Sequence, residues 1–517
     1  MPRRLAFLIC STLALAGCAG GRGDDSPPGA TGSPAPEVPL DWAGQALPFG
    51  GSHGHADPLQ HLNLTTPNFE VLGYNPLMTD YHGANSGGYY CGDVGSKTGQ
   101  RIAVTHSFTS DVALVVLDVT DAANPAKIGE LVIPRIHVYD VAMFPDASFA
   151  ILATNPPRAS PTQQTSDGLS QPQWTDACGR TTTIDQEPVP YASSVVLVDL
   201  SNPKQPRVVD SVAQPAIGPH SVFATIIDGR RFVLASTTNL VHQVSYFTFF
   251  TVDALAGAGP RLTQYGVFDA QYPAPPAGAP ALSNGHVDGW IQKHPATKEI
   301  LGYLANWNGG LIIVRLDGPG QVRSVATWSD YDTGKGSGMT GQIHDALPIE
   351  GTWGGRHFTF IGQEIVNRPA NRPTGQVIVL DTTDPTKPTP KARWTLPVDV
   401  QWSSASDQLL FSTHYIELVG QTLFVSLYHG GVWAVDARPE KGPELPTLGV
   451  FVPDRIAPKV RPGAQGDPAP EVLDVLALEN GDLVSYDGRG GVYVYRFDDT
   501  ASVPVPAPWT KDAWIRP

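Results

Sequence analysis

Sulfur-containing residues are scarce in this chain of 517 residues, which has only 4 cysteines and 4 methionines. So few thiols and thioethers argue against a soft copper electron-transfer site. Basic residues are also in the minority, with 34 Lys and Arg against 49 Asp and Glu and a formal net charge of −15. Because phosphate backbones are bound by clustered Lys and Arg, we expect no nucleic-acid partner.

Several structural and catalytic patterns are missing as well. No stretch after residue 18 sustains the apolar spacing of an amphipathic helix, so we expect an all-β chain. There is no HExxH motif, and the Gly-rich stretch at 333–341 is not followed by a helical pattern. The sequence therefore predicts no nucleotide cofactor and gives no support for a zincin.

Short apolar runs that end in a charged residue recur along the chain. The seven copies are LVVLD ending at Asp118, VVLVD at Asp199, FFTVD at Asp253, LIIVR at Arg315, VIVLD at Asp381, VWAVD at Asp436 and VYVYR at Arg496. Residues 414–436 contain three strand-like runs separated by turn residues. After a longer first interval the copies are about 55–65 residues apart, which suits four-stranded blades. The sequence therefore predicts a seven-bladed β-propeller of four-stranded antiparallel blades.

Three of the runs continue into similar turns, DVTDAANP, DLSNPKQP and DTTDPTKP. This pattern resembles the LVIVD-repeat family of bacterial propellers, and the resemblance covers roughly residues 65–498. It implies the propeller fold and says little about activity. The fourth and seventh copies differ from the family in having Arg315 and Arg496 in place of Asp.

The N-terminus has the features of an export signal. Residues 1–18 contain two arginines, an apolar run and the sequence Leu-Ala-Gly-Cys, and they resemble a bacterial lipoprotein signal with its lipobox. The resemblance implies lipidation of Cys18 and a membrane anchor, with the protein held at the outer membrane on its periplasmic or surface side; a plain secretory signal is the alternative. We expect a flexible tether with a His-containing loop at 19–64 and the propeller at 65–517.

Cys91 and Cys178 remain after the leader is removed. An even pair in an exported protein favours a disulfide, and a metal–thiolate site is the alternative. Cys178 lies in a polar insertion at 155–190, between the second and third strands of the second blade. Long loops of this kind are usually functional.

Histidine recurs near the start of the first strand of successive blades when the apolar runs are aligned. The aligned residues are His137, His220, His286, His344 and His414, with Asp474 in the seventh blade and His82 as the nearest candidate in the first. First strands line the central channel of a propeller, so these side chains are expected to ring one mouth. Imidazoles with a carboxylate are suitable ligands for one transition metal ion, Fe, Cu, Mn or Zn.

Other side chains are expected near this ring. The turns between second and third strands return to the same mouth, which would bring His106 and His429 close to it. Asp140, Asp288 and Asp345 are candidates for orienting the imidazoles by accepting hydrogen bonds from them.

These features predict a cell-envelope metal-dependent oxidoreductase that acts on a small molecule at the channel mouth. Propellers of the selenium-binding protein/methanethiol oxidase family are similar in architecture only, because their Glu-Leu-His-His-type motif is missing here. Two alternatives stay open. The histidines could bind a ligand directly, or they could be structural residues copied by duplication, which would make the protein a non-enzymatic scaffold for an envelope protein or glycan.

Overall fold

The structure is a computed structural model. It describes residues 65–75, 77, 89–107, 111–134, 136–155, 173–175, 181–183, 190–214, 218–239, 244–255, 259–269, 286–307, 310–329, 343–364, 376–396, 412–428, 430–453, 471–488 and 491–500. Among these residues the only helix is a single 3-10 turn, η4 (Pro439–Lys441), and all other regular elements are strands. The predicted leader, the tether and Cys18 lie outside the described residues.

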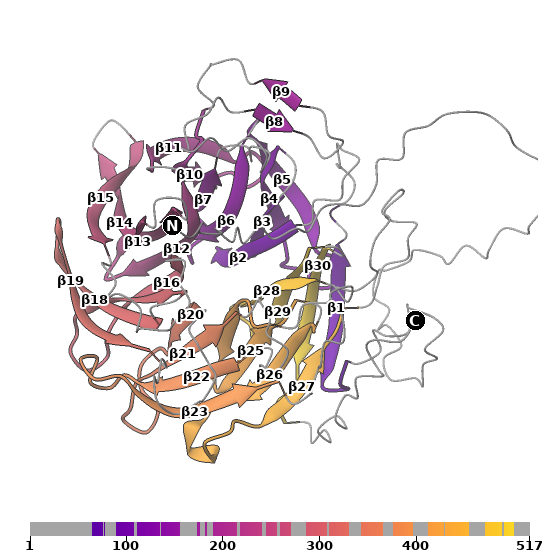
Figure 1. The fold of residues 1–517 in the computed structure, drawn as a ribbon. Coiled ribbons are helices and arrows are strands. Elements are labelled where there is room, and N and C mark those ends of the chain that lie inside the picture. The colour runs from indigo at the N-terminus through magenta and orange to yellow at the C-terminus, as the bar shows by residue number, and fades with distance from the viewer. Residues whose placement is uncertain are drawn as a thin grey trace, which may run out of the picture.

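Seven four-stranded antiparallel sheets are arranged around a central axis (Figure 1). This confirms the predicted seven-bladed β-propeller. The first three blades are β2 (Tyr89–Lys97), β3 (Gln100–Ser107), β4 (Val112–Asp118) and β5 (Ala126–Val132); β6 (His137–Met143), β7 (Phe149–Asn155), β10 (Ser194–Asp199) and β11 (Arg207–Ala213); β12 (Pro219–Ile227), β13 (Arg230–Asn239), β14 (Val244–Leu255) and β15 (Gly259–Asp269). Two short strands, β8 (Gln173–Thr175) and β9 (Thr181–Thr183), pair within the insertion of the second blade.

The remaining blades follow the same order, in which the first strand is innermost. They are β16 (His286–Lys293), β17 (Ile300–Asn306), β18 (Gly310–Gly318) and β19 (Gln321–Trp328); β20 (Ile343–Pro348), β21 (Phe358–Gln363), β22 (Gln376–Asp381) and β23 (Thr389–Thr395); β24 (Ile416–Val419), β25 (Thr422–Ser426), β26 (Val432–Asp436) and β27 (Thr447–Phe451); and β28 (Val472–Ala477), β29 (Leu483–Asp487), β30 (Gly491–Phe497) and β1 (Phe69–Asn75).

The seventh blade closes the ring with both ends of the domain. β1 is its outer strand and pairs antiparallel with β30, from Phe69 opposite Phe497 to Asn75 opposite Val492. Closure leaves no blade at an open end of the ring, which removes the unpaired face that an incomplete ring would expose.

The seven predicted apolar runs are the third strands of the blades. They read as continuous apolar sequence because each lies in the middle of its sheet with neighbouring blades packed on both faces. The Asp at the end of four of these strands accepts a hydrogen bond from the backbone N–H two residues further on. The pairs are Asp118 with Thr120, Asp199 with Ser201, Asp381 with Thr383 and Asp436 with Arg438, at 2.8–3.2 Å. The repeated Asp is therefore a turn residue.

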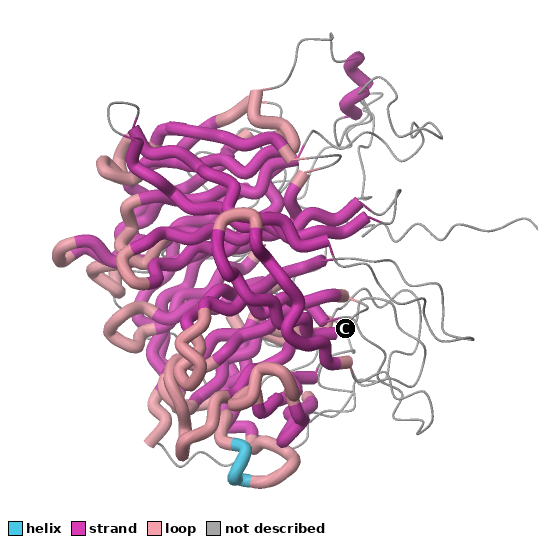
Figure 2. Tube along the Cα trace, turned by 90° about the vertical axis from the view of Figure 1, so that its left-hand side faces the viewer, coloured by secondary structure: helices cyan, strands magenta, loops and turns pink. Residues whose placement is uncertain are grey.

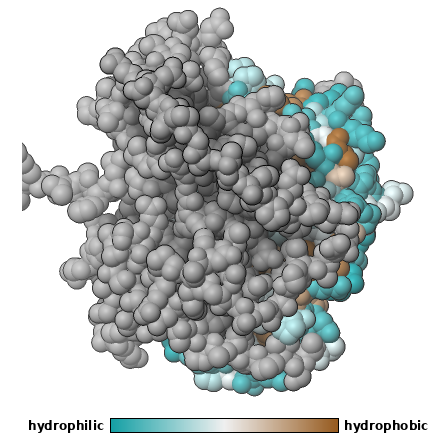
Figure 3. Space-filling view, turned by 90° about the vertical axis from the view of Figure 1, so that its right-hand side faces the viewer, coloured by the Kyte–Doolittle hydropathy of each residue, from teal (hydrophilic) through white to brown (hydrophobic). Residues whose placement is uncertain are grey.

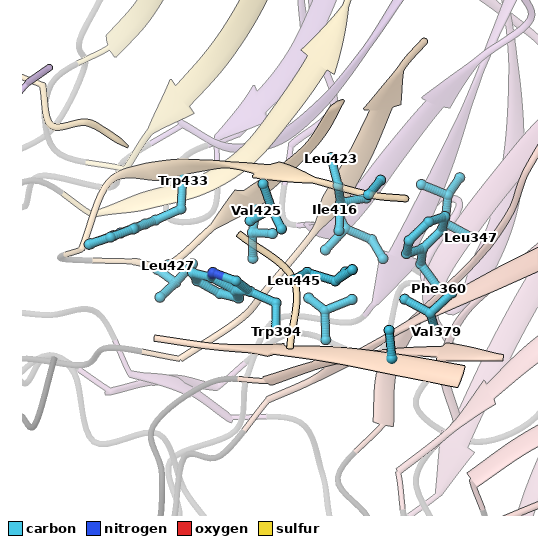
Figure 4. Packing of buried hydrophobic residues seen from close by; sticks show 14 of the residues in the cluster. Leu347, Phe360, Val379, Trp394, Ile416, Leu423, Val425, Leu427, Trp433 and Leu445 are labelled. Atoms are coloured by element: carbon cyan, nitrogen blue, oxygen red, sulfur yellow. The ribbon is translucent and has the colours of Figure 1, made fainter. Parts of the chain in front are cut away.

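The hydrophobic core is divided into seven clusters, one between each pair of adjacent blades. Figure 4 shows the cluster between the fifth and sixth blades, where Trp394 and Trp433 lie with their ring centroids 6.0 Å apart. Phe360 and Ile416 fill the same layer nearer the channel. Each buried side chain of this size stabilises the fold by about 1.5–3 kcal/mol, so adjacent blades hold one another in place.

The two faces of the ring differ in the length of their connections. Strand directions place the starts of all innermost strands on one face, and the long connections 156–172, 270–285, 330–342, 365–375, 397–411 and 454–470 all leave from that face. Strands cross the thickness of the ring, as the side view in Figure 2 shows. The coloured part of the rim in Figure 3 is largely hydrophilic, and Val132 and Val267 are the only large apolar residues that are well exposed among those described. We call the channel opening on the face with long connections the channel mouth.

Candidate functional site at the channel mouth

A β-bulge lies near the start of the innermost strand in most blades. The pairing register shifts by one residue in β2, β6, β12, β16, β20 and β28. The extra residues in β6, β12, β20 and β28 are Tyr139, His220, His344 and Leu473, and Cys91 lies within the shift of β2. Because a bulge bends its strand and redirects a side chain, the mouth is lined by residues that regular pleating would not place there.

The predicted histidines do not share one strand register. His220 and His344 are bulge residues, whereas His286 pairs with Asn306 and His137 pairs with Asn155 before the bulge. His414 lies just before β24, where its N–H donates to the carbonyl of Ser426 at 2.9 Å. The prediction of a common register is wrong, because aligning the third strands cannot account for bulges in the first.

Asp474 is the clearest correction. It follows the bulge of β28, and its Oδ2 accepts the N–H of Gly92 in the next blade at 3.1 Å. Its structural equivalents are therefore not the histidines but Asp140 and Asp345, which follow the bulges of β6 and β20.

Asp140 and Asp345 also connect adjacent blades. Oδ2 of Asp140 accepts the N–H of Val222 at 2.9 Å, and Oδ2 of Asp345 accepts the N–H of Ile416 at 3.0 Å. Asp93 makes the same kind of bond to the N–H of Met143. We name Asp93, Asp140, Asp345 and Asp474 the inter-blade carboxylates. For Asp140 and Asp345 these bonds give a structural role, and the predicted role of orienting imidazoles stays a prediction.

Burial in the channel shifts the titration of these groups. It raises the pKa of Asp93, Asp140 and Asp345 to about 7, raises that of Glu417 to about 8, and raises those of Asp288 and Asp474 well above the usual range. Repulsion from Asp345 and Asp140 adds to burial in raising the pKa of Asp288. Its predicted contact with an imidazole concerns His286, whose side chain lies outside the described residues. The channel therefore holds carboxyl groups that retain protons near neutral pH.

Two of the predicted histidines meet at the mouth. The ring centroids of His344 and His414 are 4.3 Å apart, and the ring of Tyr415 is 5.0 Å from the first and 4.7 Å from the second. Nδ1 of His414 donates to the carbonyl of Leu473 at 2.7 Å. That bond fixes the tautomer and leaves Nε2 of His414 with a lone pair.

A second group of rings lies beside this pair. Tyr139 contacts His137 at 4.5 Å and His220 at 5.4 Å between ring centroids. His220 is close enough to lower the pKa of both His344 and His414. Burial is the larger cause in each case; it lowers the pKa of His414 to about 3 and that of His344 well below its usual value. His344 and His414 are therefore neutral at pH 7.

A different histidine pair shows what a structural role looks like in this fold. His294 and His357 lie 4.7 Å apart, near the opposite face. Nε2 of His294 bonds the carbonyl of Thr382 at 3.0 Å, and both nitrogens of His357 are hydrogen-bonded, to the hydroxyl of Thr382 and the carbonyl of Ile349. By contrast, the buried Nδ1 of His344 has no hydrogen-bond partner. Buried polar atoms in native proteins are rarely left in this state without a reason.

Glu364, Tyr428 and Tyr415 complete the site, and none of them was predicted as a ligand or as a residue that orients the imidazoles. The Tyr428 hydroxyl donates to Oε1 of Glu364, whose Oε2 lies 3.9 Å from Nε2 of His344. The ring of Tyr428 is 4.9 Å from that of His414. The sequence offers one signal for the tyrosines at the mouth: a tyrosine lies next to a histidine or two residues from one, as in His137-Val-Tyr139 and His414-Tyr415.

Other predicted residues are placed apart or lie outside the description. His106 is fully buried at the end of β3 with no hydrogen-bond partner for its ring, and burial lowers its pKa to about 4. It is not among the rings that contact the His344–His414 pair. His82, His429 and the side chain of His286 lie outside the described residues.

Cys91 is buried and forms no disulfide with another of the described residues. Burial and the nearby carboxylates of Asp140 and Asp474 raise its pKa, while a hydrogen bond with Tyr415 acts in the opposite direction. Cys178 lies outside the described residues, so the disulfide stays a prediction. A free Cys91 would place one thiol among the mouth residues.

No set of three or more His, Cys, Asp or Glu side chains among the described residues has the geometry of a metal site. The described part of the predicted ring thus supplies a close histidine pair with His220 nearby. A complete donor set would need His286 or another side chain that the structure does not describe.

No protein-family model and no curated protein matches this chain. Solved structures are similar to it in fold. Sqt1 of Saccharomyces cerevisiae covers 85% of this chain and is itself covered completely, with 11% sequence identity and a TM-score of 0.45. The WD40 β-propeller domain of Doa1 covers 83% of this chain with 97% of its own length, at 9% identity and a TM-score of 0.44.

Within the part of the chain that the structure describes, no helix is long and apolar enough to cross a membrane.

Proposed function

We propose that the channel mouth holds one transition metal ion and that the protein is an oxidoreductase acting on a small molecule there. The observation that supports this is the His344–His414 pair: the buried Nδ1 of His344 has no hydrogen-bond partner, and the bond from Nδ1 of His414 to Leu473 leaves the lone pair of its Nε2. The His294–His357 pair of the same protein has its ring nitrogens hydrogen-bonded to the chain. Buried histidines that serve only the fold are expected to look like the second pair.

His344 and His414 would be two of the ligands. His220 is close to both, and the backbone of His286 places that residue at the start of β16, on the same face. Neutral imidazoles suit Fe, Cu, Mn or Zn, and a redox-active ion of this group would supply one-electron chemistry to a bound substrate. The tyrosines and Glu364 would line the substrate's side of the site.

The proposed place of action is the cell envelope. This rests on the resemblance of residues 1–18 to a lipoprotein signal, which would acylate Cys18 and anchor the protein to the outer membrane. The chain outside the propeller, residues 19–64, is long enough to set the ring away from the membrane surface.

Elemental analysis of protein purified without a histidine tag tests the proposal. We expect close to one equivalent of transition metal per chain in the wild type and a large loss in His414→Ala. His357→Ala is the matched control, because it removes a buried histidine of the hydrogen-bonded pair and should keep its metal. A wild type without metal from several growth conditions, or equal metal loss in both variants, would contradict the proposal. A redox-active ion should also change its absorption spectrum on reduction, which zinc would not.

A binding scaffold is the second candidate. It is favoured by the fact that the long connections all leave from the face that carries the mouth. Such a face can present many side chains to an envelope protein or a glycan. A metal-free wild type whose His414→Ala variant only loses stability would favour this function over the first.

A further inference from the structure

Glu364 lies directly after β21, where its side chain is buried beside the histidine pair. One carboxylate oxygen accepts the hydroxyl of Tyr428, and the other lies 3.9 Å from Nε2 of His344. The second distance is that of a charge pair and is longer than a hydrogen bond. A small rotation of either side chain would close it, and such contacts often tighten only when a site is filled.

We propose that Glu364 is a positioning residue: it directs Nε2–H of His344 toward itself and leaves Nδ1 as the lone-pair nitrogen of that ring. The assignment of this lone pair to a metal ion rests on the proposed function, whereas the positioning role does not. It agrees with the buried Nδ1 of His344 having no hydrogen-bond partner. Carboxylates commonly hold the non-coordinating N–H of a histidine ligand in this way.

Tyr428 is arranged to hold Glu364 in place. Its φ of +47° lies in the left-handed region, which is uncommon for an aromatic residue. The carbonyl of Tyr428 accepts the N–H of Val472 at 2.9 Å, so its backbone is tied to the seventh blade while its hydroxyl reaches Glu364 in the fifth. A strained backbone that is fixed on both sides is typical of a residue whose side chain must point in one direction.

The two histidines would then present opposite nitrogens. His414 donates Nδ1–H to the carbonyl of Leu473 and keeps its lone pair on Nε2, whereas His344 donates Nε2–H toward Glu364 and keeps its lone pair on Nδ1. The tautomer of His414 is thereby set by the seventh blade and that of His344 by Glu364 of its own blade, before any ion binds.

The tautomers can be measured in metal-free protein labelled with ¹⁵N-histidine, by long-range ¹H–¹⁵N correlation, with signals assigned from His344→Ala and His414→Ala. We expect Nε2–H for His344 and Nδ1–H for His414. Glu364→Ala should give His344 a mixture of tautomers and lower the affinity for Zn²⁺, used as the probe, by about 10–100-fold. Glu364→Gln keeps an acceptor oxygen and should restore the Nε2–H form. His357 serves as the internal control, because its nitrogens have partners of their own.

Each result has a separate consequence. An Nδ1–H tautomer for His344 in the wild type, or an unchanged His344 tautomer in Glu364→Ala, would overturn the positioning role. Expected tautomers in a wild type that does not bind Zn²⁺, Fe²⁺ or Cu²⁺ would support the positioning role and defeat the proposed metal site. A merely structural Glu364 would lower the melting temperature without changing the tautomer.

Discussion

At the scale of single residues, identity alone does not reveal role in this protein. His294 and His357 resemble His344 and His414 as a close pair of rings, yet both nitrogens of His357 are bonded to the chain, whereas Nδ1 of His344 has no hydrogen-bond partner. The sequence could predict that histidines gather near first strands. It could not separate the two kinds, because the hydrogen-bond partners lie far away in the sequence, as Thr382 does for His294 and Leu473 for His414.

Gly431 supports the turn that presents Tyr428, and replacing it gives a prediction at this scale. Its φ is +73°, and a Cβ there would lie 2.1 Å from the carbonyl oxygen of Phe451. Gly481 has a φ of +84° but open space around it, so Gly481→Ala is the matched control. We expect Gly481→Ala to cost about 1–2 kcal/mol from the backbone conformation alone. Gly431→Ala should cost more than about 3 kcal/mol, because the clash adds to it. Equal costs in urea unfolding would show that the strand can move away freely.

At the scale of strands, the third and first strands of each blade differ in how well the sequence predicts them. Third strands such as β22 and β26 are buried on both faces, so their apolar composition is unmistakable. Innermost strands mix apolar residues with Asp140, Asp345 and Asp474, and bulges displace their register. No periodic pattern marks a bulge, which explains why Asp474 was aligned with the histidines.

The inter-blade carboxylates should contribute to the ring's stability. Asp140 accepts the N–H of Val141 at 2.8 Å and that of Val222 at 2.9 Å, so Asp140→Ala would leave two buried donors without a partner. We expect a loss of about 1–3 kcal/mol in the free energy of unfolding. Asp121→Ala removes a comparable bond, to the N–H of Ala123, in an exposed turn and should cost under about 0.5 kcal/mol. Urea unfolding at pH 5.5 compares the two, and an equal small effect would mean that water satisfies the channel donors.

At the scale of the whole molecule, ring closure brings together groups that are far apart in the sequence. Asp93, Asp140 and Asp474 come from the first, second and seventh blades, and each carboxylate lies near another in the channel. The fold and the order of the blades could be predicted from repeats. The acidic channel could not, because Asp474 joins Asp93 and Asp140 only when β1 and β30 have paired and closed the ring.

The stability of the metal-free protein should therefore fall as the pH rises from 6 to 8.5. The carboxyl groups have folded-state pKa values of about 7 to 8, above their unfolded values, so their contribution is fully present at low pH and is lost as the pH rises through the folded values. The buried histidines act in the other direction. With folded pKa values lowered to about 4 for His106 and about 3 for His414, their contribution is present above pH 6.5 and is lost as the pH falls. Together they place the maximum on the acid side of neutrality. Melting temperatures across this range test the prediction, and Glu417→Gln, which cannot ionise, should flatten the decline above pH 7. A melting temperature that rises from pH 6 to 8.5 would mean that the channel carboxylates are ionised and neutralised in the folded protein.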